Sequence, residues 1–221
     1  REQAPADAAP AHLQVWPTEV LAQPGAKTQF AVRAYDAQGR LIGDTDAQWS
    51  LDGLMGEIDN KGNLELDEEN GGQAGKVVAT LGDLKGTARV RAVPRLPWSE
   101  DFENVALDKN PAFWVGAGSK FKVRDLDGNR VLVKPPAPFG LHRSNVYLGP
   151  PNLKDYTIQA DLLGTKKGRR RPDMGLIANR YTLDLQGNHQ RLQIRTWAAE
   201  LRMAKTIDFA WDPDVWYTVK M

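Results

Sequence analysis

The chain has 221 residues, with 29 Lys and Arg against 28 Asp and Glu, so its net charge is +1. This balance gives no general reason to expect nucleic acid as a partner. The sequence contains no cysteine, which excludes disulfides, zinc–thiolate sites and a cysteine nucleophile. It has no run of about 18 apolar residues, so we expect no membrane span.

The first twelve residues, "REQAPADAAPAH", are rich in Ala and Pro and have few large apolar side chains, as is typical of a linker. Short strands follow. "TQFAVRAY" alternates Phe30, Val32 and Ala34 with polar neighbours, "AQWSLDG" puts Trp49 in a strand, and "GKVVATLGDLKGTARVRAV" predicts two strands joined by a turn. Turn residues recur about every 8–12 positions, the spacing of a β-sandwich. No segment has a sustained helical period, so we predict no helix.

Residues 13–93 resemble a bacterial Ig-like domain of group 2. The matching features are the Pro-containing first strand with its "PG" turn, the "AYDAQG" hairpin, the strand Trp, the "GEIDNKGNL" segment and the closing "VVATLGDLKGTARVRAV" hairpin. The resemblance implies an Ig-like β-sandwich that acts as a spacer or an adhesion unit.

Residues 94–99 contain two prolines between apolar runs and predict a linker between two independently folded domains. Beyond it, "FKVRDLDGNRVLVK" predicts a hairpin with Asp127–Gly128 at its turn. We predict further strands in "SNVYLG", "DYTIQADLL", "DMGLIANR", "YTLDLQ", "HQRLQIRTW" and "VWYTVKM".

Residues 100–221 resemble the concanavalin-like jelly rolls related to bacterial 3-keto-disaccharide hydrolases, through "DFE", Trp114, "DLDGNRVL", "LKDYTIQADLL", "MGLIANRY" and "WYTVKM". The tandem is similar to the C-terminal region of planctomycete-type proteins with a PQQ-like β-propeller. That resemblance implies an upstream β-propeller in the same parent chain and a periplasmic or extracellular location. Because the last predicted strand has no turn signal after it, we expect a C-terminally truncated jelly roll in a piece of a longer protein.

Polar and aromatic residues gather in "RPDMGLIANRYTLDLQ" and "LQIRTW". An aromatic ring beside guanidinium and amide groups suits a sugar, since the ring packs on C–H faces and the polar groups bind hydroxyls. Strand alternation places Arg195 and Trp197 on one face. The alternative is an Arg–Trp stack on a solvated face. The predicted ligand-binding residues are Asn179, Arg180, Tyr181, Arg195 and Trp197.

The segment "KKGRRR" concentrates positive charge in a predicted loop. It is either a solvated hairpin or a contact to an anionic polysaccharide, a lipid headgroup or an acidic protein surface. It has no interleaved aromatics, so it is a weak signal for nucleic acid. The basic-loop residues are Lys166, Lys167, Arg169, Arg170 and Arg171.

Catalytic signals are weak. Asp173 and Asp184 lie on neighbouring predicted strands but at different positions along them, which disfavours a glycosidase pair. The histidines have no metal-ligand spacing, and "DLDGN" lacks the later glutamate of a calcium loop. We therefore predict no catalytic residue, metal or cofactor.

From these patterns we expect an all-β protein: an Ig-like sandwich followed by an incomplete jelly roll. The favoured function is a non-catalytic binding or structural module of an exported β-propeller protein, facing carbohydrate or another envelope component. The alternatives are a sugar-processing enzyme of the 3-keto-disaccharide hydrolase kind and a purely structural spacer.

Overall fold

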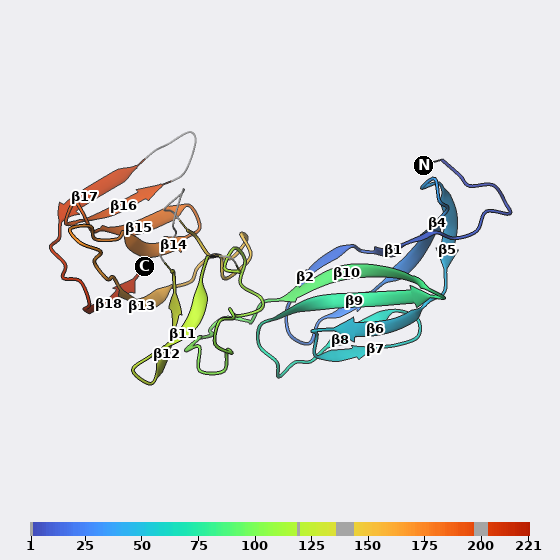
Figure 1. Ribbon diagram of the computed structural model, residues 1–221, viewed down its shortest axis with the longest axis horizontal. Coiled ribbons are helices and arrows are strands. Elements are labelled where there is room, and N and C mark those ends of the chain that lie inside the picture. Colours follow the sequence, from blue (N-terminus) through green and yellow to red (C-terminus); the bar gives the residue numbers. More distant parts are fainter. Residues whose placement is uncertain (1, 119, 136–143, 197–202) are drawn as a thin grey trace. The chain divides into compact units, whose positions relative to one another are not determined.

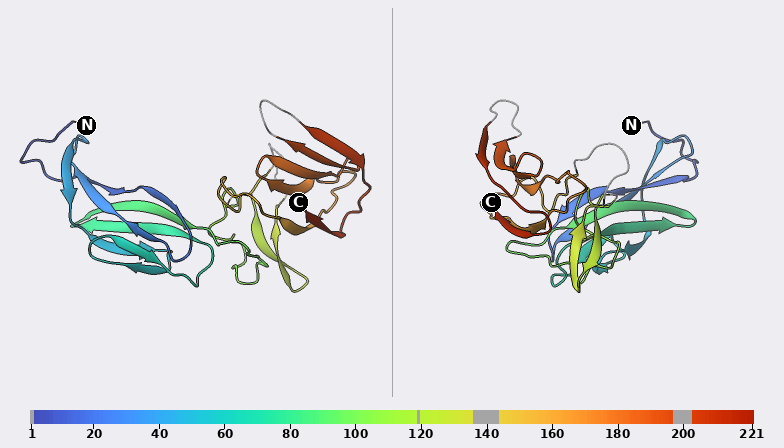
Figure 2. Two further views of the ribbon diagram at one scale, coloured as in Figure 1. Left: turned by 180° about the vertical axis from the view of Figure 1, so that it is seen from behind. Right: turned by 60° about the vertical axis from the view of Figure 1, so that its left-hand side comes forward.

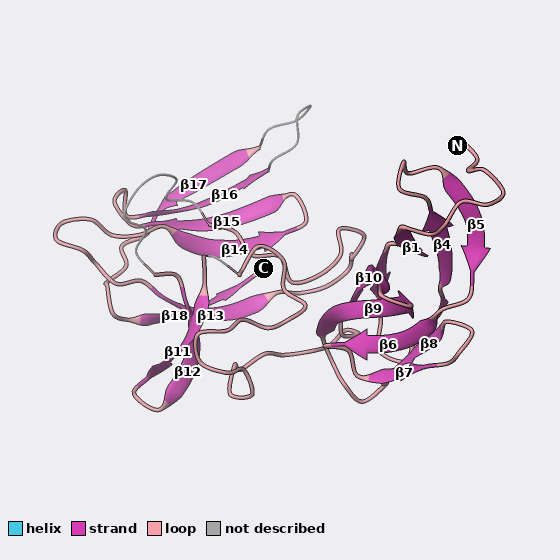
Figure 3. Ribbon diagram, turned by 45° about the vertical axis from the view of Figure 1, so that its right-hand side comes forward, coloured by secondary structure: helices cyan, strands magenta, loops and turns pink. Residues whose placement is uncertain are grey.

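The computed structural model describes residues 2–118, 120–135, 144–196 and 203–221. All regular structure in these segments is strand, and none of the described residues is helical (Figure 3). The prediction of an all-β, sandwich-type fold is therefore confirmed. Packing divides the chain into two compact units, Arg1–Gly149 and Pro150–Met221.

The first unit contains a sandwich of short sheets, in which the long strands β9 and β10 lie side by side (Figure 1). One sheet has the order β1-β4-β5 and is formed by His12–Trp16, Ala31–Tyr35 and Leu41–Thr45. A second has the order β2-β10-β9-β6 and is formed by Glu19–Ala22, Leu84–Ala92, Gln73–Leu81 and Gln48–Asp52. A third has the order β3-β8-β7 and is formed by Lys27–Gln29, Asn63–Leu66 and Gly56–Ile58.

One core joins these sheets. Val15 of β1 and Val32 of β4 face inward from the first sheet, and Val77 of β9 and Val90 of β10 face inward from the second; each is at most 2% exposed. Burying such side chains contributes about 1.5–3 kcal/mol each. The alternation of apolar and polar residues along β10 therefore fixes which face of that strand meets the core.

The predicted strand "TQFAVRAY" is divided at Phe30, which is a correction to the sequence analysis. β3 ends at Gln29 and pairs with β8, whereas β4 begins at Ala31 and pairs with β1 and β5. Phe30 itself is 1% exposed, and its N–H donates to Gly62 O at 2.8 Å. The chain changes sheets here because the Phe30 ring enters the core between them.

Residues after the sandwich form the hairpin of β11 (Lys122–Leu126) and β12 (Asn129–Val133), a two-stranded ribbon in both views of Figure 2. Its turn is the predicted Asp127–Gly128, with φ of 55° and 85°. Two successive positive φ values are the signature of a type I′ turn, whose twist matches the strands.

The second unit has two sheets. The larger has the order β14-β15-β16-β17 and is formed by Met174–Ala178, Tyr181–Gln186, Arg191–Thr196 and Ala204–Asp208. The smaller pairs β13 (Gln159–Leu163) with β18 (Trp216–Lys220). Leu176, Leu185, Trp211 and Val219 form the buried core of this unit.

Two further strand predictions need correction. β17 was not predicted, because "AKTID" has little apolar alternation. All five of its residues are exposed in the structure. "SNVYLG" forms no strand, and its one β-bridge pairs Tyr147 with Val115. Both errors concern segments whose side chains do not enter the main core, where hydrophobic alternation carries little information.

Candidate functional site

The larger sheet of the second unit has one polar face. Antiparallel pairing sets Thr182 opposite Arg195, Asp184 opposite Gln193 and Gln186 opposite Arg191. Residues directly opposite share a face, so six polar side chains lie together on β15 and β16. The intervening residues point to the other face, where Leu183, Leu185 and Leu192 pack in the core. We call this set of side chains the polar face; it comprises Thr182, Asp184, Gln186, Arg191, Gln193, Arg195 and Thr206. Thr182 and Gln186 are buried, each 7% exposed.

Hydrogen bonds connect the polar face across three strands. Arg191 Nε donates to Gln186 Oε1 at 2.6 Å, and Gln186 Nε2 donates to Gln193 Oε1 at 3.2 Å. Gln193 Nε2 in turn donates to Thr206 Oγ1 on β17 at 3.0 Å. Each amide is held in one orientation by its neighbours, so these donors and acceptors are pre-organised.

Arg195 and Asp184 form a half-buried ion pair on the same face. Arg195 Nη2 donates to Asp184 Oδ2 at 3.0 Å, and the two side chains are 25% and 14% exposed. A charge-assisted bond in partial shelter from water is stronger than a surface pair. The pair holds the Arg195 guanidinium beside the Asp184 carboxylate.

The predicted ligand residues are distributed over both faces of the sheet. Arg195 lies on the polar face, whereas Tyr181 lies opposite Thr196 on the other face and is 42% exposed. Asn179 and Arg180 form the β14–β15 turn and are exposed. Trp197 lies outside the described residues.

Asn179 stabilises the β14–β15 turn through its backbone conformation and its hydrogen bonds. With φ of 54° it lies in the left-handed region, which Asn tolerates better than most residues. Its Nδ2 donates to Leu153 O at 3.0 Å, and its backbone N–H donates to Tyr156 Oη at 3.2 Å. The Asn179 amide thus ties the turn to the segment before β13.

Gln186, Arg191 and Gln193 are polar-face residues that the sequence analysis did not single out. The signal was present in "LDLQ" and "RLQIR", where polar and apolar residues alternate strictly. Alternation shows which residues share a face of a strand. The register that sets Gln186 opposite Arg191 comes only from the structure.

The basic loop is a tight hairpin. Lys167 and Arg170 exchange both backbone hydrogen bonds, at 2.9 and 3.1 Å, around a two-residue turn of Gly168 and Arg169. Gly168 has φ of 61°, as the first central residue of a type II′ turn requires. Residues 166–170 are all exposed, and we call this segment the basic hairpin.

Arg171 differs from the other cations of the loop. Its Nη1 donates to Trp211 O at 2.6 Å, and its guanidinium carbon lies 5.9 Å from the centroid of the Trp211 ring. Its backbone N–H donates to Asn188 Oδ1 at 3.0 Å. Trp211 is 1% exposed, so Arg171 anchors the hairpin to the core of the second unit.

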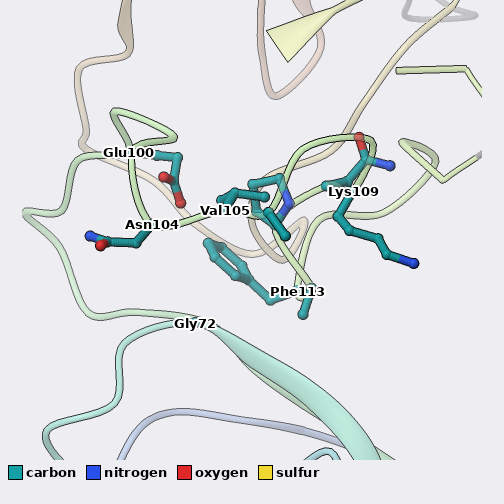
Figure 4. A pocket seen from close by; sticks show the side chains of 10 residues that line it. Gly72, Glu100, Asn104, Val105, Lys109 and Phe113 are labelled. Atoms are coloured by element: carbon teal, nitrogen blue, oxygen red, sulfur yellow. The ribbon is translucent and has the colours of Figure 1, made fainter. Parts of the chain in front are cut away.

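The first unit has a hollow of about 290 Å³ that is lined by Phe113; Figure 4 shows the side chains around it. The Phe113 ring lies between the backbone at Gly72 and the loop that carries Glu100, while the Lys109 ammonium points away from the ring (Figure 4). Glu100 Oε1 accepts the N–H of Phe102 at 2.8 Å. One carboxylate oxygen is therefore committed to the loop itself.

The acidic residues considered for catalysis have other bonds. Asp173 Oδ1 accepts the Gly187 N–H at 2.9 Å, and Asp184 pairs with Arg195. Asp125 Oδ1 accepts the Gly128 N–H at 3.0 Å, as in a plain hairpin turn. Across residues 2–118, 120–135, 144–196 and 203–221, no three His, Cys, Asp or Glu side chains lie close enough to hold a metal ion.

Comparison with known proteins adds no family to this geometry. The sequence matches no protein-family model and no curated protein sequence. In the described part of the chain, no helix is long and apolar enough to cross a membrane.

Proposed function

We propose that this chain is a non-catalytic binding or structural module that contacts carbohydrate through the polar face of its second unit. The observation that carries the proposal is the row of fixed amide, guanidinium and carboxylate groups on β15 and β16. Sugars present hydroxyls that both donate and accept, and side-chain amides and carboxylates match them. Donors already held in place lose little entropy when a ligand binds.

The resemblance of the sequence to tandem Ig-like and jelly-roll modules supports the context of this proposal. It favours an exported protein that faces the cell envelope, with a β-propeller upstream in the parent chain. Trp197 is the proposed stacking platform, because it is the largest flat apolar side chain next to the polar face in sequence.

The enzyme alternative has less support. Asp173 and Asp184 are each engaged by a neighbouring donor, at 2.9 and 3.0 Å. A retaining glycosidase needs two carboxyl groups that reach one glycosidic bond, one of them able to give up its proton. If the polar face binds no ligand, the alternative of a purely structural spacer is favoured.

A glycan array probed with the chain at low salt and at high salt tests the proposal. We expect neutral glycans to be retained with little dependence on ionic strength, since hydrogen bonds and ring stacking are screened far less than exposed charges. The retained glycan is then titrated into Gln193→Ala and, as a control, into Gln159→Ala, an exposed β13 residue outside the polar face.

Loss of binding in Gln193→Ala and in Trp197→Ala, but not in Gln159→Ala, supports the polar face. Equal affinities for all variants would place the glycan elsewhere. If no glycan binds at millimolar concentration, carbohydrate binding is contradicted and the structural-spacer alternative is favoured.

A further inference from the structure

We propose that the basic hairpin is a second binding site, specific for an anionic polysaccharide that bears sulfate or carboxylate groups. The four cations of the hairpin are Lys166, Lys167, Arg169 and Arg170. This inference does not depend on the polar face, because it concerns different residues and a different kind of interaction.

The four hairpin charges are not neutralised within the described part of the chain. None of them lies within 4.0 Å of a described carboxylate, whereas Arg33, Arg89 and Arg124, for example, do have such partners. Asp173, the acidic residue that follows the hairpin, is engaged by the Gly187 N–H. The hairpin therefore presents a local positive charge on a chain whose net charge is only +1.

The register of the hairpin makes this charge costly in the free protein. Lys167 and Arg170 lie directly opposite each other across the ladder. Cβ atoms of such pairs are about 4.5–5.5 Å apart, and like charges there are destabilising. An anion between the two side chains removes the repulsion, so the hairpin gains stability when it binds.

The hairpin is also held in place for binding. Arg171 fixes its base to Trp211, and Asn188 accepts the Arg171 N–H. Gly187 packs so closely that a Cβ atom on it would lie 2.2 Å from Pro172 O. The cations project from a rigid base, which reduces the entropy lost on binding.

The chemistry of the hairpin favours a polysaccharide over other polyanions. Arginine forks bind sulfate and carboxylate through two parallel hydrogen bonds. Residues 165–170 contain no aromatic or large apolar side chain. Proteins bind single-stranded nucleic acid largely by stacking bases on aromatic side chains, and interfacial membrane segments insert apolar groups. The hairpin has neither kind of side chain.

The test uses dextran sulfate, with uncharged dextran as the matched probe, and the whole chain. The hairpin variant combines Lys166→Gln, Lys167→Gln, Arg169→Gln and Arg170→Gln. The control variant combines Lys76→Gln, Lys85→Gln, Lys205→Gln and Lys220→Gln, which are exposed residues on β9, β10, β17 and β18. Both variants lose four positive charges, so total charge is matched.

We expect dextran sulfate to bind, dextran not to bind, and affinity to fall steeply with added salt. The hairpin variant should bind about ten-fold more weakly or worse, since several exposed charges contribute together, and the control variant should keep most of the affinity. Equal losses in both variants would overturn the site, as would no binding of dextran sulfate at low salt. Binding to vesicles with anionic lipid in place of dextran sulfate would also overturn it.

Discussion

The ring of Phe113 fills the space that a side chain at Gly72 would need. A Cβ atom built on Gly72 would lie 1.9 Å from Phe113 Cδ1. Phe113 is 5% exposed and meets Trp98 edge to face, with ring centroids 5.5 Å apart. Residues beyond the predicted linker at 94–99 thus pack against the segment that leads into β9, and the first compact unit runs to Gly149.

Gly72→Ala should therefore destabilise the first unit. The added methyl group has to displace a buried ring, and overpacking of this kind costs about 1–3 kcal/mol. Urea unfolding measures the loss. Gly71→Ala is the matched control, because its Cβ atom would meet only Pro94 Cγ, at 3.9 Å. Equal stability of the two variants would contradict the packing described for Phe113.

Arg171→Met should destabilise the second unit while Arg170→Met should not. Arg171 bonds to Trp211 O and lies over the Trp211 ring, whereas the exposed Arg170 makes no such contact. A hydrogen bond from a charged group is worth about 1.5–3 kcal/mol. Thermal unfolding of both variants tests the difference, and similar melting temperatures would show that Arg171 is not an anchor.

Asp184 and Arg195 should show an interaction free energy in a double-mutant cycle. The variants are Asp184→Asn, Arg195→Met and the two combined. Contacting pairs in partial shelter typically couple by about 0.5–3 kcal/mol. The free energy of unfolding is measured for all three variants. If the losses of the two single variants sum to the loss of the double variant, the two side chains have no interaction free energy, and the ion pair does not stabilise the fold.

Asp36 should make the first unit sensitive to acid. Burial favours its neutral form, but the N–H and side chain of Arg40 and the N–H of Gln38 outweigh this and hold the pKa of Asp36 below its ordinary value of 3.8. The lowered pKa stabilises the folded state above the unfolded pKa, and this stabilisation is lost as the pH falls through the folded pKa.

The natural chain should have a larger free energy of unfolding than Asp36→Asn. This difference should be constant above about pH 5 and shrink below about pH 4. Urea unfolding at a series of pH values measures it, with the exposed Asp52→Asn as control. If this difference in free energy of unfolding grew as the pH fell, it would contradict a lowered pKa of Asp36.

Local patterns predicted the fold better than the site. The Asp127–Gly128 turn follows from two residues, and strict alternation marks β15 and β16. Arg171 anchors the hairpin through Trp211, which lies 40 positions later. Within "KKGRRR", no local pattern distinguishes Arg171 from the neighbouring cations. Register and long-range packing set such contacts, and neither can be read from local propensity.

The polar face is tested most directly by hydrogen–deuterium exchange on the whole chain, with and without a glycan retained on the array. Our account predicts slower exchange in Tyr181–Gln186 and Arg191–Thr196, and unchanged exchange in Gln159–Leu163 and Trp216–Lys220. Protection confined to β13 and β18, to the first unit or to the basic hairpin would contradict carbohydrate binding at the polar face.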